Sequence, residues 1–285
     1  MVNSVKIIEC PRDAMQGIKS HFIPTETKAK YINSLLKVGF DTIDFGSFVS
    51  PKAIPQMKDT AEVLSKLDLS TTKSKLLAIV ANVRGANDAS QFEEIDYLGY
   101  PFSISENFQM RNTHKTIDQS IDTLKEVLAI ANRTNKEVVA YLSMGFGNPY
   151  GDPWSVEIVG EWTEKLSSFG VKILSLSDTI GSSTPEDIDY LFSNLIPSYP
   201  QIEFGAHLHT TPTKWHEKVD SAFKAGCRRF DGAIKGYGGC PMAKDELTGN
   251  MPTEKLLSYF TANKVATNIK PMSFESAYNK ALEVF

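Results

Sequence analysis

Short apolar runs rich in β-branched residues recur at regular intervals along the chain. Runs of this length and composition, separated by polar segments, are typical of buried strands. The pattern predicts eight strands, at residues 5–9, 42–45, 76–80, 95–100, 138–143, 171–177, 202–209 and 228–234.

Segments with apolar residues three and four positions apart lie between these runs. This spacing places the apolar side chains on one face of a helix. The clearest predicted helices are residues 25–39, 117–133, 154–170, 185–196 and 213–226. Gly39, Gly170 and Gly226 close three of them, as glycine often does at the carboxyl end of a helix.

Strand and helix therefore alternate through the chain without a change in composition. Eight strand-helix units at this length predict an α/β fold of the closed (β/α)8 type, a TIM barrel, with a doubly wound sheet as the alternative. We expect residues 1–285 to form one domain, with a last helix near residues 274–285 packed outside the barrel. Catalytic residues of such barrels lie at the carboxyl ends of the strands.

Composition and charge narrow the choice of partner. The chain has 285 residues, of which 41% are hydrophobic and 22% charged, and its formal net charge is -4. A negative net charge gives no electrostatic reason for nucleic acid or an anionic membrane to be the main partner. We therefore expect a small-molecule partner, no nucleic acid and no membrane.

The amino terminus and the cysteines predict a cytoplasmic protein. A strand pattern begins at residue 5, which leaves no room for a secretory signal, and no apolar run approaches the 18 residues of a membrane span. Cys10, Cys227 and Cys240 are odd in number and lack metal-finger spacing, so we expect reduced thiols.

Polar residues crowd the segment after the first predicted strand. Residues 9–17 include Glu9, Arg12, Asp13 and Gln16. Polar loops are common at barrel mouths, and an Arg next to an Asp is often only an ion pair. From the residues alone, a structural role and a functional one are both open.

Two further acids lie in or after predicted strands. Asp44 stands between Ile43 and Phe45, and a charge in such an apolar run needs a partner. Asp178 ends the sixth strand, where a turn or helix-capping aspartate is the simpler interpretation.

His207 and His209 end the seventh predicted strand. Alternate side chains of a strand point to the same face, so both imidazoles share a face and Leu208 points away from them. Two histidines on one face at the catalytic end of a barrel strand indicate a shared metal ion.

The segment after the eighth strand carries a thiol between glycines. Gly236, Gly238 and Gly239 permit unusual backbone angles, so this loop can fold over a ligand and bring Cys240 with it. Cysteine is usually buried and inert. Because burial is not expected in such a polar loop, Cys240 is the best candidate for a chemical thiol.

Seven short motifs in order carry a family resemblance over nearly the whole chain. They are PRDAMQ (11–16), SFVSPKAIPQM (47–57), SENFQMRN (105–112), LSDTIG (176–181), HLH (207–209), GGCP (238–241) and GNMPTE (249–254). The chain resembles hydroxymethylglutaryl-CoA lyases, metal-dependent (β/α)8 enzymes of the group that also contains isopropylmalate and homocitrate synthases.

The resemblance implies a divalent metal cofactor, Mg2+ or Mn2+. Its implied ligands are Asp13, His207, His209 and Asn250. Two imidazoles with oxygen donors suit a six-coordinate cation that keeps places for substrate oxygens, and zinc remains an alternative.

The implied reaction is a reversed Claisen condensation that cleaves 3-hydroxy-3-methylglutaryl-CoA to acetoacetate and acetyl-CoA. By resemblance, Arg12 stabilises the thioester oxygen as it becomes an enolate. Cys240 acts as acid or base at the enolate carbon, and Asp178, His207 and Glu9 assist proton movement.

The resemblance also implies the partners. An acyl-CoA substrate is expected to contact Arg12, Gln16, Asp44, Tyr141 and Thr179. A homodimer or higher homo-oligomer is expected, in leucine degradation or a related acyl-CoA pathway.

The chain departs from the family pattern at four places. Thr210 stands where the family has an aspartate after the histidines, so we expect the ligands to lack an acid that orients them. Asp44 replaces a glutamate, Val139 replaces an arginine, and the loop between Glu9 and Pro11 is one residue shorter. These changes predict a modified acyl pocket.

Two other functions compete with the lyase. A condensing synthase of the same group would share Arg12, Asp13 and the histidines, but it typically carries a Gly-Glu-Arg type sequence where this chain has GGCP. An inactive barrel kept as a binding protein would not need the ligands and Cys240, and Thr210 is the feature in its favour.

Overall fold

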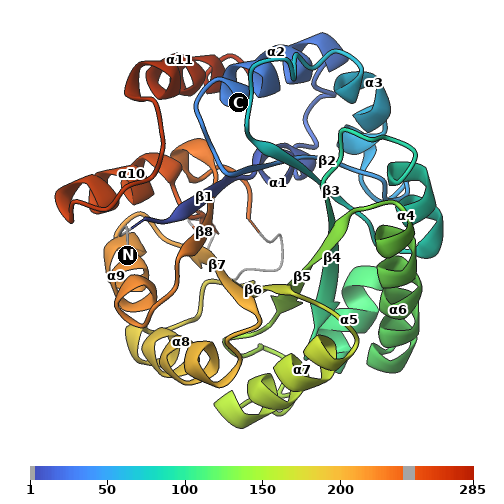
Figure 1. Cartoon of the computed structure of the whole chain (residues 1–285), viewed down its shortest axis with the longest axis vertical. Helices are drawn as coiled ribbons and strands as arrows, with labels where there is room; N and C mark the ends of the chain where they lie inside the picture. The colour runs from blue at the N-terminus through green and yellow to red at the C-terminus, as the bar shows by residue number, and fades with distance from the viewer. Residues whose placement is uncertain (1–3, 240–247) are drawn as a thin grey trace.

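Parallel strands pair in chain order around a closed ring (Figure 1). The structure is a computed structural model, and it describes residues 4–239 and 248–285. Each strand from β1 to β8 pairs in parallel with the next, and β8 pairs with β1. The fold is therefore a TIM barrel, as predicted.

All eight predicted strands are present. They are β1 (Lys6–Glu9), β2 (Thr42–Ser47), β3 (Lys75–Ile79), β4 (Tyr97–Ser103), β5 (Glu137–Ser143), β6 (Ile173–Asp178), β7 (Glu203–Thr210) and β8 (Arg229–Gly232). A ninth strand, β9 (Gly249–Asn250), runs antiparallel to the end of β7. No sequence pattern predicted this two-residue strand.

Helices cover the outside of the ring (Figure 1). The five helices predicted from periodicity correspond to α2 (Thr25–Leu36), α6 (Ile117–Arg133), α7 (Val156–Ser168), α8 (Pro185–Ser198) and α9 (Trp215–Lys224). The others are α1 (Pro11–Gln16), α3 (Thr60–Leu64), α4 (Val83–Ala89), α5 (Glu106–Thr113), α10 (Thr253–Ala262), α11 (Pro271–Ala281) and the 3-10 turns η1 (Pro55–Met57) and η2 (Ile234–Gly236). Most of those not predicted are too short to show a helical period.

Helix α6 illustrates how local sequence determines the elements. Thr116 and Gln119 form a capping box at its start, each side chain accepting a hydrogen bond from the other's backbone N–H. Ile121, Leu124 and Leu128 recur at helical spacing and are all buried. The helix therefore begins at a cap and packs one apolar face on the sheet.

The apolar side chains form two separate cores. The larger core lies between strands and helices, and it includes Leu208, which points away from the histidines as predicted. A small cluster fills part of the lumen: Leu77, Ile79, Tyr97, Val139, Tyr141 and Ile173. The carboxyl end of the lumen is left to polar side chains.

The C-terminal helix packs outside the barrel, as predicted. Helix α11 lies beside α2 (Figure 1). Phe274 of α11 packs edge to face against Phe40, which follows α2, with ring centroids 6.5 Å apart. Phe285 makes a similar contact with Tyr31 at 6.0 Å. Among the described residues, no helix is both long and apolar enough to span a membrane.

A buried ion pair joins α9 to the ends of β6 and β7. Lys218 Nζ lies 2.6 Å from Asp178 Oδ2 and also donates to the carbonyls of Gly181 and His209. Both charged side chains are 1% exposed. Ser183 donates two further hydrogen bonds to Asp178 through its backbone N–H and its hydroxyl. The pair thus fixes the carbonyl of His209.

Replacing Lys218 with methionine should destabilise the protein strongly. Asp178 would remain buried without a counter-charge, which costs about 3–5 kcal/mol in the free energy of unfolding. Urea unfolding at neutral pH measures this. The control Lys224→Met breaks an exposed pair with Asp220 and should cost less than about 1 kcal/mol. Equal losses in the two variants would contradict the interpretation.

Candidate active site

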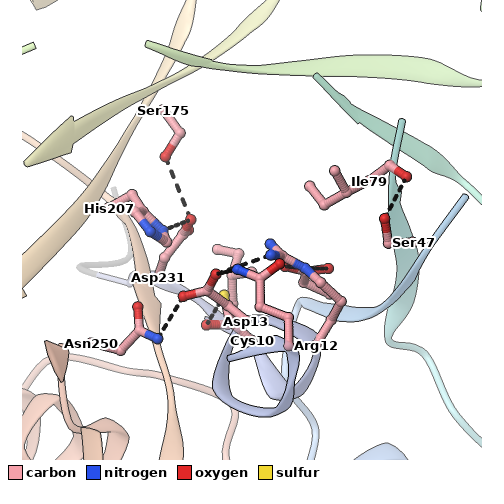
Figure 2. A network of polar contacts seen from close by, with 12 residues as sticks. Cys10, Arg12, Asp13, Ser47, Ile79, Ser175, His207, Asp231 and Asn250 are labelled. Carbon is pink, nitrogen blue, oxygen red and sulfur yellow. Dashed lines mark hydrogen bonds and ion pairs between the residues drawn. The ribbon is translucent and has the colours of Figure 1, made fainter. Parts of the chain in front are cut away.

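Asp13 lies at the centre of a hydrogen-bond network at the barrel mouth (Figure 2). The short helix α1 starts with Pro11 directly after β1 and places Arg12, Asp13 and Gln16 over the lumen. Asp13 Oδ1 accepts from Arg12 Nη1 at 2.9 Å and from Gln16 Nε2 at 2.6 Å. Its Oδ2 accepts from Asn250 Nδ2 at 2.7 Å. Three donors thus hold this carboxylate in one orientation.

The charges around Asp13 keep it ionised. Burial alone would raise the pKa of Asp13, but Arg12, the two histidines and the Asn250 hydrogen bond outweigh burial and lower it. An ionised, buried carboxylate at the mouth is a suitable ligand for a cation.

Arg12 also binds Asp44 on β2. Its Nε lies 3.0 Å from Asp44 Oδ2 and its Nη2 lies 2.5 Å from the same oxygen. Burial disfavours the charge on Arg12, but Asp44 and Asp13 raise the pKa of its guanidinium. Burial raises the pKa of Asp44 to about 6, against the opposing effect of Arg12. Arg12 is therefore a fixed positive charge at the mouth, and Asp44 has the partner that its apolar strand required.

His207 and His209 lie on one face of β7, as predicted, with ring centroids 5.3 Å apart. One nitrogen from each ring and one oxygen of Asp13 all lie within 4.8 Å of one another. His209 Nδ1 donates to the Thr179 carbonyl at 2.9 Å. His207 Nδ1 lies 3.0 Å from Asp231 Oδ2, an acid on β8 (Figure 2). These bonds leave the Nε2 atoms of both rings as the available ligand atoms.

One buried atom indicates that a cation fits here. His209 Nε2 is buried and has no hydrogen-bond partner among the residues that the structure describes. Because Nδ1 donates a proton, Nε2 carries a lone pair, and a buried lone pair needs a partner. Asn250 pairs in register with His209 between β9 and β7, so its amide oxygen can join the set. Two imidazoles, a carboxylate and an amide oxygen fit a divalent cation.

The two rings have different protonation tendencies. Burial lowers the pKa of His207, but the hydrogen bond and charge of Asp231 and the charge of Asp13 raise it overall. Burial and the neighbouring His207 lower the pKa of His209. His209 is therefore held neutral, the form that binds a metal ion.

Asp231 is the site residue that the sequence reasoning missed. It is 3% exposed and also accepts a hydrogen bond from Ser175 at 3.5 Å. The expectation that the histidines lack an orienting acid is wrong, because β8 supplies one to His207. Thr210 is buried on the other face and donates to the Thr211 carbonyl instead. The sequence contained a signal for this residue, because a charged side chain in the apolar eighth strand needs a partner, as Asp44 does in the second strand.

The other predicted substrate contacts lie around this cluster. The ring of Tyr141 on β5 meets His207 edge to face at 5.5 Å. Thr179 follows β6, and its hydroxyl accepts from the Met144 backbone N–H at 2.9 Å. Gln16 contacts Asp13 directly. Their contact with a substrate stays a prediction.

Two of the predicted proton-transfer residues face away from the cluster. Asp178 binds Lys218 of α9. Glu9 is fully buried and accepts from the Ile234 backbone N–H at 2.8 Å and from the Thr253 hydroxyl at 2.6 Å. Burial raises the pKa of Glu9 to about 8, against these two hydrogen bonds. The geometry favours a structural role for both acids.

Cys240 lies outside the described residues, but the chain before and after it touches the cluster. A Cβ added to Gly238 would lie 2.6 Å from the Asp13 carbonyl oxygen and 2.9 Å from Asn250 Nδ2. Gly238 has a φ of +84°, which glycine adopts without strain. This glycine is thus required for close packing against two of the proposed ligands.

A cavity of about 780 Å³ opens at the same end of the barrel as the cluster. Loops after β5, β6 and β7 line it, with Phe146, Asn148, Ile180, Thr211, Lys214 and Thr248 among the lining residues. It lies at the carboxyl ends of the strands, where barrel enzymes bind substrates.

Comparison with known proteins gives consistent similarities. A family model described as HMGL-like matches residues 5–280. A hydroxymethylglutaryl-CoA lyase of Bacillus subtilis is 33% identical over 260 residues, which cover 91% of this chain and 86% of that protein.

Solved structures agree with the sequence match. The crystal structure of the Bacillus subtilis HMG-CoA lyase has a TM-score of 0.92 and 32% identity, covering 99% of this chain and 95% of that chain. An HMG-CoA lyase from Acinetobacter baumannii, solved with coenzyme A and 3-methylmalate, has a TM-score of 0.90 and 28% identity, covering 99% of this chain and 91% of that chain.

Replacing Asp231 with asparagine should weaken cation binding about 10–100-fold, because the carboxylate that fixes the His207 ring is lost. Calorimetric titration of the metal-free protein with Mn2+ measures the change. Thr210→Val is the matched control, since the Thr210 hydroxyl donates to the Thr211 carbonyl and not to an imidazole, and the Mn2+ affinity of this variant should stay within about threefold of the parent. An unchanged affinity in Asp231→Asn would contradict the orienting role.

Replacing Glu9 with glutamine should alter the pH dependence of stability and not turnover. A folded-state pKa raised from 4.5 to about 8 favours the neutral acid. Its stabilising contribution is therefore complete below pH 4.5 and is lost as the pH rises toward 8. When the pH rises from 5.5 to 8, the free energy of unfolding should fall in the parent by about 1–3 kcal/mol more than in Glu9→Gln. Urea unfolding at the two pH values measures this difference. A large fall in turnover would instead indicate a catalytic Glu9.

Proposed function

The chain belongs to the HMGL-like family, and from this premise we propose that it cleaves 3-hydroxy-3-methylglutaryl-CoA to acetyl-CoA and acetoacetate. Its curated relatives are HMG-CoA lyases, which are enzymes. The observation that carries the proposal is the convergence of Asp13, His207, His209 and Asn250 beside Arg12 at one end of the barrel.

The cofactor in this proposal is Mg2+ or Mn2+. Asp13, His207, His209 and Asn250 would hold it, and when bound it would acidify the tertiary hydroxyl of the substrate. Two observations support this donor set: His209 Nε2 has no hydrogen-bond partner within residues 4–239 and 248–285, and Asp13 is ionised. The oxygen-rich part of the set favours these ions over softer ones.

The reaction requires stabilisation of the developing enolate, removal of a proton from the hydroxyl oxygen and delivery of a proton to the enolate carbon. The hydroxyl loses its proton and becomes the ketone of acetoacetate, while the electrons of the broken carbon-carbon bond form the acetyl-CoA enolate. Arg12 places a fixed positive charge where the enolate oxygen develops. Because Asp44 and Asp13 hold its guanidinium in place, little reorganisation is needed during the reaction.

Proton transfer is assigned to Cys240 and to His207. Cys240 gives a proton to the enolate carbon, and the hydroxyl proton passes to the His207–Asp231 pair, where Asp231 Oδ1 has no hydrogen-bond partner among the described residues and can accept it. We assign Asp178 and Glu9 to structure, because Lys218 and Thr253 occupy their carboxylates. The sequence GGCP at residues 238–241 favours this lyase over a condensing synthase.

The acyl-CoA substrate enters from the cavity at the barrel mouth. Its acyl end reaches the lumen near Tyr141 and Gln16, and its coenzyme A arm follows the loops after β5, β6 and β7. The coenzyme A bound to the Acinetobacter relative supports a ligand of this class.

We place the reaction in leucine degradation or a related acyl-CoA pathway, in the cytoplasm, and we expect a homodimer or higher homo-oligomer. Among the described residues, both cysteines are free thiols, which suits a reducing compartment.

Metal-stripped protein should release acetoacetate from 3-hydroxy-3-methylglutaryl-CoA only after Mg2+ or Mn2+ is added. In the restored enzyme, Cys240→Ser should lower kcat by about 10²–10⁴-fold, the usual contribution of a general acid, with Mn2+ affinity unchanged. Cys227→Ser is the matched control, because that thiol is buried far from the mouth and donates to the Arg229 carbonyl.

Two results would contradict this assignment. Full turnover in Cys240→Ser would remove the thiol from the mechanism. Absence of acetoacetate with both metals would exclude this substrate and direct the search to shorter and longer 3-hydroxyacyl-CoA esters.

A further inference from the structure

A second group of metal-ligating side chains lies deeper in the lumen. Sγ of Cys10, a ring nitrogen of His207 and a carboxylate oxygen of Asp231 all lie within 4.8 Å of one another. Cys10 is 1% exposed and Asp231 is 3% exposed. Figure 2 shows Cys10 close to Asp13, with His207 and Asp231 on the other side of the Asp13 carboxylate.

Two atoms of this group have unused bonding capacity. Asp231 Oδ1 is buried without a hydrogen-bond partner in the described part of the chain. The Cys10 thiol makes one weak contact, to the Ile8 carbonyl oxygen at 3.9 Å. Taken separately, Cys10 could be a small residue that fills the lumen, and Asp231 Oδ1 could be hydrated. Neither explanation accounts for why both atoms lie within 4.8 Å of a ring nitrogen of His207.

The local charge favours a cation. Asp13, Asp44 and Asp231 act on the Cys10 thiol as negative charges, and Arg12 acts on it as a positive one. Arg229 supplies a second buried positive charge near Asp231. Arg229 also has acidic neighbours of its own, since it lies 3.7 Å from Asp41 and 3.8 Å from Glu203. The three carboxylates that act on Cys10 therefore outnumber the guanidinium of Arg12, and the excess negative charge attracts a positive ion.

We propose that Cys10, His207 and Asp231 form a second cation centre that takes a thiophilic divalent ion such as Zn2+ and competes with the mouth centre for His207.

The two centres differ in the ligand atoms that they offer and therefore in the ions that they prefer. A thiolate, an imidazole and a carboxylate suit tetrahedral Zn2+ or Cd2+ with a fourth position open, whereas Mg2+ prefers oxygen ligands. Ligand atoms on one zinc ion lie roughly 3.3–3.7 Å apart at usual bond lengths. His207 Nδ1 and Asp231 Oδ2 are 3.0 Å apart, and Cys10 Sγ lies within 4.8 Å of both residues' ligand atoms, so the thiol must move closer by up to about 1.5 Å.

His207 can bind only one of the two ions at a time, because one of its two ring nitrogens carries a proton. A neutral imidazole has one lone-pair nitrogen. With Nδ1–H donated to Asp231, Nε2 serves the mouth centre. Binding of the deeper ion to Nδ1 moves the ring proton to Nε2, and Cys10 loses its thiol proton to solvent. The mouth centre then lacks one ligand.

Titration of the metal-free full-length protein with Cd2+ tests the proposal, because a Cd–thiolate bond has a near-ultraviolet charge-transfer band. The band should saturate with one ion per chain in the parent and persist in Cys227→Ser and Cys240→Ser. Cys10→Ser should abolish it, and Asp231→Asn should weaken the Cd2+ affinity more than about tenfold. Circular dichroism checks that each variant is folded, and Cys10→Ala provides a second test if the serine variant is not.

Competition is measured separately by electron paramagnetic resonance of bound Mn2+. Zn2+ should release Mn2+ from the parent, and Cys10→Ser should need more than about tenfold more Zn2+. A band that survives in Cys10→Ser or disappears in Cys240→Ser would overturn the proposal, as would equal Zn2+ competition in parent and Cys10→Ser. No substrate enters these experiments, so they stand whether or not the protein cleaves 3-hydroxy-3-methylglutaryl-CoA.

Discussion

Closure of the parallel barrel is the constraint on which the site depends. Pairing of β6 with β7 and of β8 with β1 completes the ring. Because every barrel strand runs in the same direction, all carboxyl ends meet at one mouth. Asp13, His209 and Asn250 come from segments as much as 237 residues apart, and Asn250 still donates to Asp13 at 2.7 Å. A doubly wound open sheet would not bring the first and last strands together.

The partner of each buried acid determines what that acid can do. Asp44 fixes Arg12, and Asp231 orients His207. Asp178 is occupied by Lys218, which also binds the His209 carbonyl, so this acid supports the end of β7 from outside the lumen. Glu9 is held between the Ile234 amide and the Thr253 hydroxyl and is neutralised by burial. Similar carboxylates therefore serve different roles because their surroundings differ.

The two histidine rings are oriented without the aspartate that the resemblance places at position 210. Each imidazole needs an acceptor at Nδ1, and the chain provides one from a side chain and one from a backbone carbonyl. An acid directly after the histidines is not needed for either bond. The same lumen places Cys10 next to His207 and Asp231, so a thiol, an imidazole and a carboxylate lie beside the cluster of Asp13, His207 and His209.

Much of this protein was determined by the sequence alone. Strand and helix periodicity predicted all eight barrel strands, and alternation along β7 placed His207 and His209 on one face, because these are local properties of the backbone. Tertiary structure decided which way Glu9 and Asp178 point, that Asp231 reaches His207, and that β9 carries Asn250 to β7. These outcomes depend on contacts between residues far apart in the chain. Periodicity describes the face of a single strand and carries no information on which distant side chain will oppose it.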